Sequence, residues 1–482
     1  MSVELLSIVV LFGVFFLLMF LSVPVSISIG LATIATVLLS LPFDNAMFVS
    51  AQKMITALDS FALLALPFFI LAGNIMNRGG IAMRLINLAL VLAGRLPGAL
   101  AHCNVIANML FGSISGSAVA AAAAVGGTMG EMERKAGYDP GYAAAVNIAS
   151  CPTGLLIPPS NTFIVYSTVS GGTSVAALFL AGYLPGILMG LGIMVVAGVI
   201  AWRRKYPVNE RVPLNAAVGA FIQAILPLSL VIIVIGGIVK GYFTATEGSA
   251  IAVVYALFLA MVVYREIKLK DLPKIFLDSM VTNAIVMLLI GCSSGMSWAM
   301  ANADIPIIIE EAILALSENK VIILLTINLI LLIVGFFMDM TPAILIFTPI
   351  FLPIAESLGV DPVHFGVMMT FNLCMGIVTP PVGSCLFVGC SVGKVRLAQV
   401  IPYMLPMYIA LLFALPLLLL MARLSRPLTL ALSLVLWWGV QKYNLAWPVY
   451  EAGDVWFFNP LAWQLMFVIG ILCASVRKTG SP

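Results

Sequence analysis

The sequence predicts an all-α polytopic membrane protein built from two inverted repeats, each with a re-entrant helical hairpin and a broken helix. Three observations predict this fold: the composition, polar interruptions within long apolar runs, and motifs that recur at one offset. Hydrophobic residues make up 62% of the 482 residues and charged residues 9%, which is too little charge to cover a soluble protein of this size. Backbone groups in lipid must be hydrogen-bonded within the chain, and strict strand-like alternation is absent, so the spans are expected to be helices.

The first apolar run extends from Leu5 to Phe43 and contains no Asp, Glu, Lys, Arg or His. Its 39 residues are enough for two crossings, because one crossing takes about 20 apolar residues. Glu4 stands where a signal peptide would carry basic residues, so no cleavable leader is expected. Further apolar segments are expected near residues 60–77, 98–128, 141–170, 175–202, 214–238, 245–264, 276–301, 320–358, 363–392 and 398–422.

Two of these segments, 98–128 and 320–358, are interrupted near the middle by GSISGS and GFFMDMTP. Each could be one long helix or a hairpin that enters and leaves the membrane on the same side. The basic clusters at 203–205, 265–274 and 394–396 favour hairpins, because all three then lie on the cytoplasmic side. This arrangement places the N-terminus outside.

An internal repeat relates the two halves of the chain at an offset of 222 residues. The matching pairs are GYDP at 137–140 with GVDP at 359–362, Pro158-Pro159 with Pro380-Pro381, Gly154 with Gly376, Gly73 with Gly295 and, within one residue, Gly112 with Gly335. The first hairpin is expected to enter from inside and the second from outside, so the repeats are predicted to be inverted. We expect a first repeat over 1–212, a second over 213–424 and a two-helix tail over 425–482.

Inverted repeats with paired broken helices are typical of secondary transporters. A break at mid-membrane frees backbone carbonyls and half-helix C-termini, which suit a cation such as Na⁺, while half-helix N-termini suit a carboxylate. Irregular backbone at that depth is tolerated only inside protein or along a cavity. A channel filter could also use carbonyls, but it would not need two inverted copies.

Each polar candidate also has an ordinary structural interpretation. The stretch Thr379–Gly383 could be a packing kink, and GSISGSA at 112–118 could be a small-residue helix contact. Asp339 is an acidic residue deep inside an apolar run. It is a functional candidate because a carboxylate within the membrane costs free energy, but it could instead be the N-cap of a helix that begins at Thr341. Ser294, within GCSSG, could line a substrate cavity or a packing face.

The regions outside the breaks carry weaker signals. The stretches 81–96 and 305–316 are amphipathic and are expected to be interfacial helices on opposite sides of the membrane. Asp59 and Asp304 are expected at the outer mouth, either as solvated surface charge or as docking contacts for an outside partner.

Metal, hydrolase and ATP-driven chemistries are not expected. The chain has two histidines, and its seven cysteines form no CxxC pair. No P-loop motif is present, so an ATP-driven permease would need a partner ATPase.

Residues 1 to about 424 resemble the large membrane subunit of tripartite ATP-independent periplasmic (TRAP) transporters. The resemblance rests on LDSFALLALPFFILAGNIMNRGGIAMRL at 58–85, FGSISGSAVA at 111–120, AGYDPGYAAA at 136–145, LLIPPSNTF at 155–163, FLAGYLPGI at 179–187, FTATEGSAIAVVYAL at 243–257, GFFMDMTPAILIFTPIFLPIA at 335–355, HFGVMM at 364–369 and GIVTPPVG at 376–383. It implies a transporter subunit of the bacterial inner membrane, not an enzyme, that moves a transport domain against a scaffold in an elevator mechanism.

The resemblance also implies ligands and partners. The expected partners are a small four-helix membrane subunit, a periplasmic substrate-binding protein and membrane lipid, with no nucleic acid, no ATPase and no cofactor beyond Na⁺ as coupling ion. The expected substrates are organic acids, such as C4-dicarboxylates and sialic acids. A stand-alone Na⁺/dicarboxylate symporter of related elevator fold is the alternative.

Site residues follow by position from the matching motifs. One sodium site is expected at Ser113, Ser115, Ser117, Pro158, Ser160 and Asn161, and the other at Gly335, Met338, Thr379 and Pro381. Substrate is expected at Ser117, Asn161, Asp339 and Gly383 of these motifs, and at Ser294, which lies in the GCSSG stretch outside them.

The tail differs from this family pattern. Its FFNPLAWQLMFVIG at 457–470 is similar to membrane proteins that acylate periplasmic glucans, and two spans are expected near 427–441 and 457–474. A membrane acyltransferase defined by the tail is therefore a third hypothesis, but the tail contains no histidine to act as a base. We assign the tail no function.

Overall fold

The computed structural model describes residues 3–94, 96–207, 213–315, 317, 319–380 and 383–409, and the tail predicted over 425–482 lies outside them. The described residues form helices and no strand. They include seven helices long and apolar enough to cross a membrane: Phe61–Arg78, Val175–Arg203, Asn215–Val239, Ala245–Val263, Leu269–Asn302, Lys320–Phe337 and Met340–Ser357. The prediction of an all-α polytopic membrane protein is confirmed. The chain divides into one unit over Met1–Tyr408 and another over Ile409–Pro482, and all seven of these helices belong to the first.

The N-terminal apolar run forms two helices, α1 (Val3–Phe20) and α2 (Val25–Val37), and Pro24 stands at the N-cap of the second. A third helix, α3 (Phe43–Leu58), was not among the predicted segments. Its sequence mixes Asp44, Gln52 and Lys53 with apolar residues, so it has no apolar run to reveal it.

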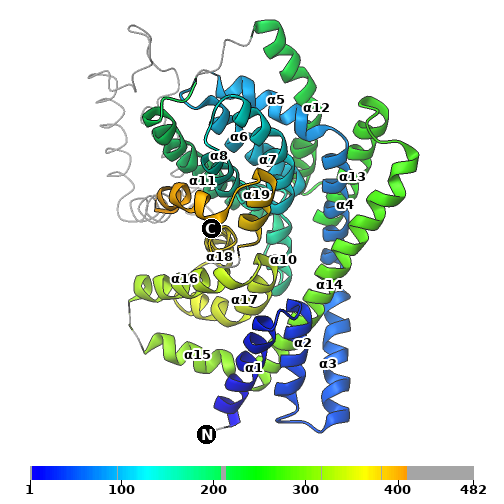
Figure 1. Ribbon diagram of the computed structural model, residues 1–482. Helices are drawn as coiled ribbons and strands as arrows, with labels where there is room; N and C mark the ends of the chain where they lie inside the picture. The colour runs from blue at the N-terminus through cyan, green and yellow to red at the C-terminus, as the bar shows by residue number, and fades with distance from the viewer. Residues whose placement is uncertain are drawn as a thin grey trace, which may run out of the picture. The chain divides into compact units, whose positions relative to one another are not determined.

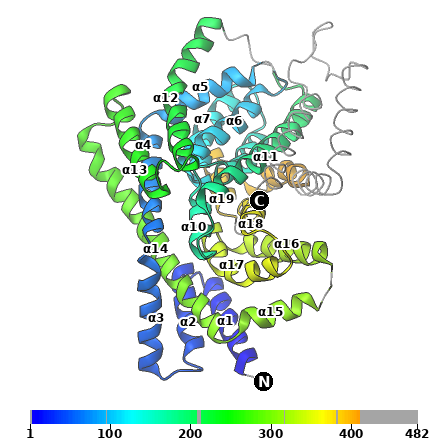
Figure 2. The same cartoon turned by 180° about the vertical axis from the view of Figure 1, so that it is seen from behind.

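A group of long helices, α4 (Ala65–Arg78), α13 (Ala245–Phe258) and α14 (Leu272–Asn302), lies side by side along one edge of the unit (Figures 1 and 2). We call these three helices the scaffold group. Helix α12 (Leu214–Val239) packs against α13.

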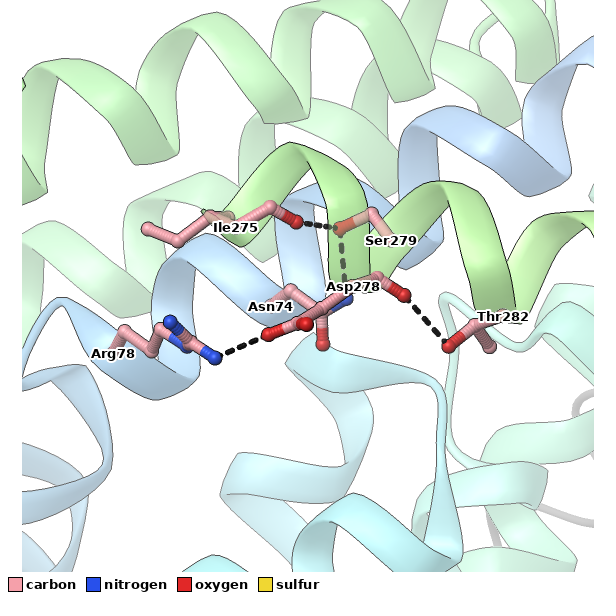
Figure 3. Close-up of polar contacts among 6 residues, drawn as sticks. All are labelled: Asn74, Arg78, Ile275, Asp278, Ser279 and Thr282. Carbon is pink, nitrogen blue, oxygen red and sulfur yellow. Dashed lines mark hydrogen bonds and ion pairs between the residues drawn. The ribbon is translucent and has the colours of Figure 1, made fainter. Parts of the chain in front are cut away.

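Polar contacts join α4 to α14 within the scaffold group (Figure 3). Arg78 forms an ion pair with Asp278, and Asn74 Nδ2 donates to Ser279 Oγ at 2.8 Å. Ser279 Oγ in turn donates to the carbonyl oxygen of Ile275 at 2.8 Å. These side chains fix the register of two apolar helices that otherwise share only packing contacts.

The two amphipathic stretches form α5 (Ile81–Ala93) and α15 (Ile305–Leu314), as predicted. They lie at opposite ends of the unit in both views (Figures 1 and 2). Arg84 on α5 stacks on the ring of Tyr264, with 3.7 Å between the guanidinium carbon and the ring centroid, and pairs with Glu266. The first of these helices is thereby tied to the turn that follows α13.

Two helical hairpins occupy the predicted segments: α6 (Ala99–Ser115) with α7 (Ala118–Lys135), and α16 (Lys320–Phe337) with α17 (Met340–Ser357). The first tip is narrower than predicted, because the residues from Gly112 to Ser115 belong to the last turn of α6. Only Gly116, in the left-handed region at φ 60°, and Ser117 lie between the helices.

Both predicted broken helices are interrupted, the first between Leu156 and Asn161, around Pro158 and Pro159, and the second between Gly376 and Ser384. The first consists of α8 (Pro140–Ser150), α9 (Thr153–Leu156) and α10 (Asn161–Val169), and the second of α18 (Pro362–Gly376) and α19 (Ser384–Gly393). The helix α11 (Val175–Arg203) follows the first of them.

The repeated GYDP and GVDP motifs start the two broken helices. Asp139 Oδ1 accepts from the backbone N–H of Gly141 at 2.8 Å, and Asp361 Oδ1 accepts from that of Val363 at 2.9 Å. A proline follows each aspartate at the first helical position, where its missing N–H costs nothing.

Candidate functional site

The first hairpin crosses the first broken helix at a pair of glycines. A methyl group on Gly154 would lie 2.3 Å from the Cα of Gly112, and one on Gly112 would lie 2.6 Å from the Cα of Gly154. No side chain fits between these two backbones. The last turn of α6 therefore rests directly on α9, next to the break.

The second hairpin crosses the second broken helix in the same way. A methyl group on Gly376 would lie 2.6 Å from the Cα of Gly335, and one on Gly335 would lie 3.0 Å from the Cα of Gly376. Both glycine pairs were among the residues matched by the internal repeat. The two crossings place each hairpin tip beside a break.

The tips and breaks bring four helix N-termini together. At the first tip, a methyl group on Gly116 would lie 3.3 Å from both Asn161 Nδ2 and the carbonyl oxygen of Pro159. One residue into α10, Thr162 Oγ1 contacts Met340 Sδ at the start of α17, at 3.2 Å.

The N-terminus of α19 is the fourth, and it is linked to the other three through the tip of the second hairpin. Ser384 Oγ, at the start of α19, donates to Asp339 Oδ1 at 3.0 Å. The contacts therefore connect the starts of α7, α10, α17 and α19 in one chain. Because the backbone N–H groups of a first helical turn have no partner within the helix, these ends attract negative charge.

Asp339 stands at the N-cap position of α17, as its ordinary interpretation predicted, but its side chain makes no capping bond. Its carboxylate is exposed and turns instead toward Ser384. Ser117, which occupies the matching position in the first tip, does cap its own helix, because its Oγ accepts from the N–H of Ala120 at 3.3 Å.

Other predicted hydroxyls bond to free carbonyls at the breaks. Ser160, fully buried, donates to the carbonyl oxygen of Leu155, and the peptide bond between Pro158 and Pro159 is cis. Thr379 Oγ1 donates to the carbonyl oxygen of Met375 at 2.6 Å. Each break thus presents a hydroxyl beside a helix C-terminus.

The remaining candidates near the tips are also placed. Ser113 and Ser115 are nearly buried in the last turn of α6, where Ser113 Oγ donates to the carbonyl oxygen of Leu110 at 2.8 Å. Met338 is buried at the end of α16. Gly383 closes the second break, since a methyl group there would lie 2.9 Å from the carbonyl oxygen of Thr379.

Three predicted residues are not brought to the tips by any hydrogen bond in the described part of the chain. Ser294 lies on α14 beside Gly295, which packs near Thr33 of α2. Asp59 and Asp304 are exposed, at the C-cap of α3 and the N-cap of α15. Pro381 lies outside the described residues.

A buried amide network between α6 and α8 was not among the features predicted from the sequence. Asn108 Nδ2 lies 2.9 Å from Asn104 Oδ1, 3.0 Å from Asn147 Oδ1 and 2.9 Å from Ser150 Oγ. Asn104 reaches the fully buried carboxylate of Glu133 on α7. The sequence does contain a sign of this network: Asn104 and Asn108 are polar residues one helical turn apart in an apolar run.

The second hairpin has a smaller counterpart. Asn372 Nδ2, on α18, lies 2.7 Å from the carbonyl oxygen of Asn328 and 2.8 Å from Asn328 Oδ1. In both repeats, amide side chains therefore join the first arm of the hairpin to the first half of the broken helix.

Comparison with known proteins identifies the family. The family model described as the DctM component of tripartite ATP-independent periplasmic transporters matches residues 12–424. A second model, described as OpgC protein, matches residues 397–482, in agreement with the similarity predicted for the tail.

Individual proteins are also similar to this chain over most of its length. The uncharacterized protein YgiK of Salmonella typhimurium is 60% identical over 404 residues, which are 84% of this chain and 93% of the relative. The sialic acid TRAP transporter large permease SiaM of Vibrio cholerae is 37% identical over 398 residues, 82% of this chain and 92% of the relative. The C4-dicarboxylate TRAP transporter large permease DctM of Pseudomonas aeruginosa is 38% identical over 385 residues, 80% of this chain and 90% of the relative.

A solved structure shows a similar fold. The structure of MtrF from Neisseria gonorrhoeae, described as an antimetabolite efflux pump, has a TM-score of 0.53 at 12% identity and covers 76% of this chain and 83% of its own. The match over most of the chain and the identity to several TRAP large permeases leave one conclusion: this chain belongs to the DctM component family of tripartite ATP-independent periplasmic transporters and is an integral membrane permease, not an enzyme.

Proposed function

We propose that this chain is the large permease of a Na⁺-coupled uptake system for an organic acid, which a periplasmic binding protein delivers. The observation that carries the proposal is the meeting of the starts of α7, α10, α17 and α19. Their connection runs through Gly116 with Asn161, Thr162 with Met340, and Asp339 with Ser384. The backbone N–H groups at the starts of these linked helices suit a carboxylate.

The same breaks offer oxygen ligands for Na⁺. The helix C-termini beside the tips carry carbonyls without helical partners, and Ser115, Ser160 and Thr379 add hydroxyl groups. A substrate carboxylate and a Na⁺ ion bound at neighbouring helix ends would stabilise each other because their charges are opposite. This supports coupling between the two ligands rather than independent binding.

The elevator mechanism completes the proposal. The hairpins and broken helices would move as one body against the scaffold group, with repeats over 1–212 and 213–424 inverted and the hairpins re-entrant. Gly73 of α4 faces the first tip, where a methyl group would lie 3.0 Å from the carbonyl oxygen of Ser115. Because Gly73 has no side chain, it does not obstruct movement of the first tip along α4 at this contact.

The proposed partners follow from the family. A separate small membrane subunit would accompany the chain in the bacterial inner membrane, with the N-terminus in the periplasm. The exposed carboxylates of Asp59 and Asp304 would serve as docking contacts for the binding protein. The relatives named for sialic acid and C4-dicarboxylates support a carboxylate substrate.

The test is uptake of labelled sialic acid and C4-dicarboxylates into proteoliposomes that contain this chain and its small subunit. An inward Na⁺ gradient is applied, with and without the binding protein. Uptake that needs both is the expected result. Uptake of free substrate without the binding protein would make the chain a stand-alone symporter, and uptake without Na⁺ would contradict the coupling.

Matched variants locate the sodium ligands. Ser160→Ala and Thr379→Ala should raise the Na⁺ concentration for half-maximal uptake about tenfold, the effect of losing about 1.4 kcal/mol of binding. Thr282→Ala is the control, because Thr282 is an exposed hydroxyl on α14 that bonds only within its own helix. Equal Na⁺ dependence in all three variants would remove Ser160 and Thr379 from the sodium sites.

A further inference from the structure

A small cleft lies between α6, α7, α8 and α19, away from the hairpin tips. Its wall is largely glycine and alanine, and its polar side chains come from α6, α7 and α8. The lining includes Asn104, Gly126, Gly130, Glu133, Arg134, Asn147, Gly389 and Gly393. None of these residues belongs to the proposed sodium or substrate sites.

Glu133 is the one carboxylate that is buried among the described residues, with 0% of its surface exposed. Its partner is a single amide: Asn104 Nδ2 lies 3.4 Å from Oε1 and 3.5 Å from Oε2. None of the ion pairs in the described part of the chain includes Glu133.

The other titratable groups around Glu133 do not neutralise it. Cys103 of α6, Tyr138 before α8 and Tyr142 within α8 face it, and all three are uncharged at neutral pH. Helix α19 contributes only glycines to the cleft.

The basic side chains near Glu133 do not pair with it. Lys135 pairs with Glu131 at 2.9 Å, and Lys394, just past α19, also faces Glu131. Arg134 is exposed at the cleft and forms no ion pair with Glu133. No positive side chain of the described residues compensates the buried carboxyl.

A lone ionised carboxylate in such a place would cost far more free energy than a neutral carboxylic acid. We propose that Glu133 is a proton-binding site, neutral in this arrangement, that exchanges its proton with solvent through the cleft beside Arg134. The inference goes beyond the proposed function and does not depend on Na⁺ coupling. Asn104 and Asn108 link the site to Ser150 at the end of α8, so the proton and the first break share one network.

The test is infrared spectroscopy of the purified full chain at pH 7 in Na⁺-free buffer. The wild type should show the carbonyl band of a protonated carboxyl, and Glu133→Gln should lose it. Glu131→Gln is the matched control, because Glu131 lies on the same helix but is exposed and paired with Lys135. This control should keep the band.

Identical spectra for the wild type and Glu133→Gln would overturn the proposal. A band in Na⁺-free buffer that Na⁺ abolishes in the wild type at pH 7 would also overturn it, because a metal cation would then displace the proton. If Glu133→Gln does not accumulate, Glu133→Asp is the second variant, and it should shift the band rather than leave it unchanged. Failure of Na⁺-dependent uptake would not move the band, so the two proposals fail separately.

Discussion

The two break regions of this permease share a backbone and differ in their side chains. In both, a glycine in the last turns of a hairpin arm meets a glycine of a broken helix, Gly112 with Gly154 and Gly335 with Gly376. At the tips, however, Ser117 caps its own helix, whereas Asp339 accepts from Ser384 of another helix. The repeat therefore preserves the glycines that set the path of the backbone, and it does not preserve the side chains at the tips.

The different side chains at the two tips give the two break regions different charge. The first tip is neutral, so the N-termini around it keep their full attraction for an anion. The second tip carries an exposed carboxylate, which offsets that attraction and favours a cation or a hydrogen-bond donor. The same backbone path thus carries an uncharged tip in the first hairpin and a tip with an acidic side chain in the second.

Substitution of the crossing glycines should produce the largest effects and rank the two crossings. Gly112→Ala forces a methyl group to 2.6 Å from a backbone atom, and the equivalent Gly335→Ala to 3.0 Å. We expect losses of about 3 kcal/mol or more for the first and about 1–2 kcal/mol for the second in unfolding free energy, measured in detergent micelles.

The control for this ranking is Gly130→Ala on α7, where nothing lies within 4 Å of an added methyl group. It should be neutral or stabilise by up to about 1 kcal/mol, since alanine favours the helix. Equal losses at both crossings would mean that the two breaks are equally tight and that the comparison of distances has no energetic meaning.

The amide networks should give the next largest effects. Asn108→Ala leaves Asn104, Asn147 and Ser150 without a shared buried partner and should cost about 2–3 kcal/mol. Asn372→Ala removes only its contacts with Asn328, one of them to a backbone carbonyl, and should cost about 1 kcal/mol.

The readout is again the unfolding free energy in micelles, with Thr326→Ala as control. Thr326 is partly exposed on α16 and bonds within its own helix, so its change should stay within about 0.5 kcal/mol. A larger loss from Asn372→Ala than from Asn108→Ala would reverse the comparison.

Much of this framework could be predicted from the sequence. The offset of the repeat, exact or within one residue, matched the glycines that form the two crossings and the prolines of the two breaks, although the crossings themselves were not predicted. The polar details could not be predicted in the same way. Glu133 stands in EMERK, a stretch typical of a solvated helix end, and only the packing of α6, α8 and α19 buries it. The direction in which Asp339 turns depends on a helix 45 residues further along the chain.

The smallest expected effect on stability concerns the tips, and it separates folding from function. Ser117→Ala removes a helix cap and should cost about 1 kcal/mol of unfolding free energy, with modest loss of uptake. Asp339→Asn should change stability by less than about 0.5 kcal/mol, because the side chain is exposed and its amide oxygen can still accept from Ser384. Its uptake, measured in proteoliposomes with the small subunit and binding protein, should nevertheless fall strongly and need more Na⁺, because the negative charge at the second tip is gone. Full transport by Asp339→Asn, with an unchanged Na⁺ requirement, would show that this carboxylate is only a structural contact and that the two tips do not differ in the ligands they hold.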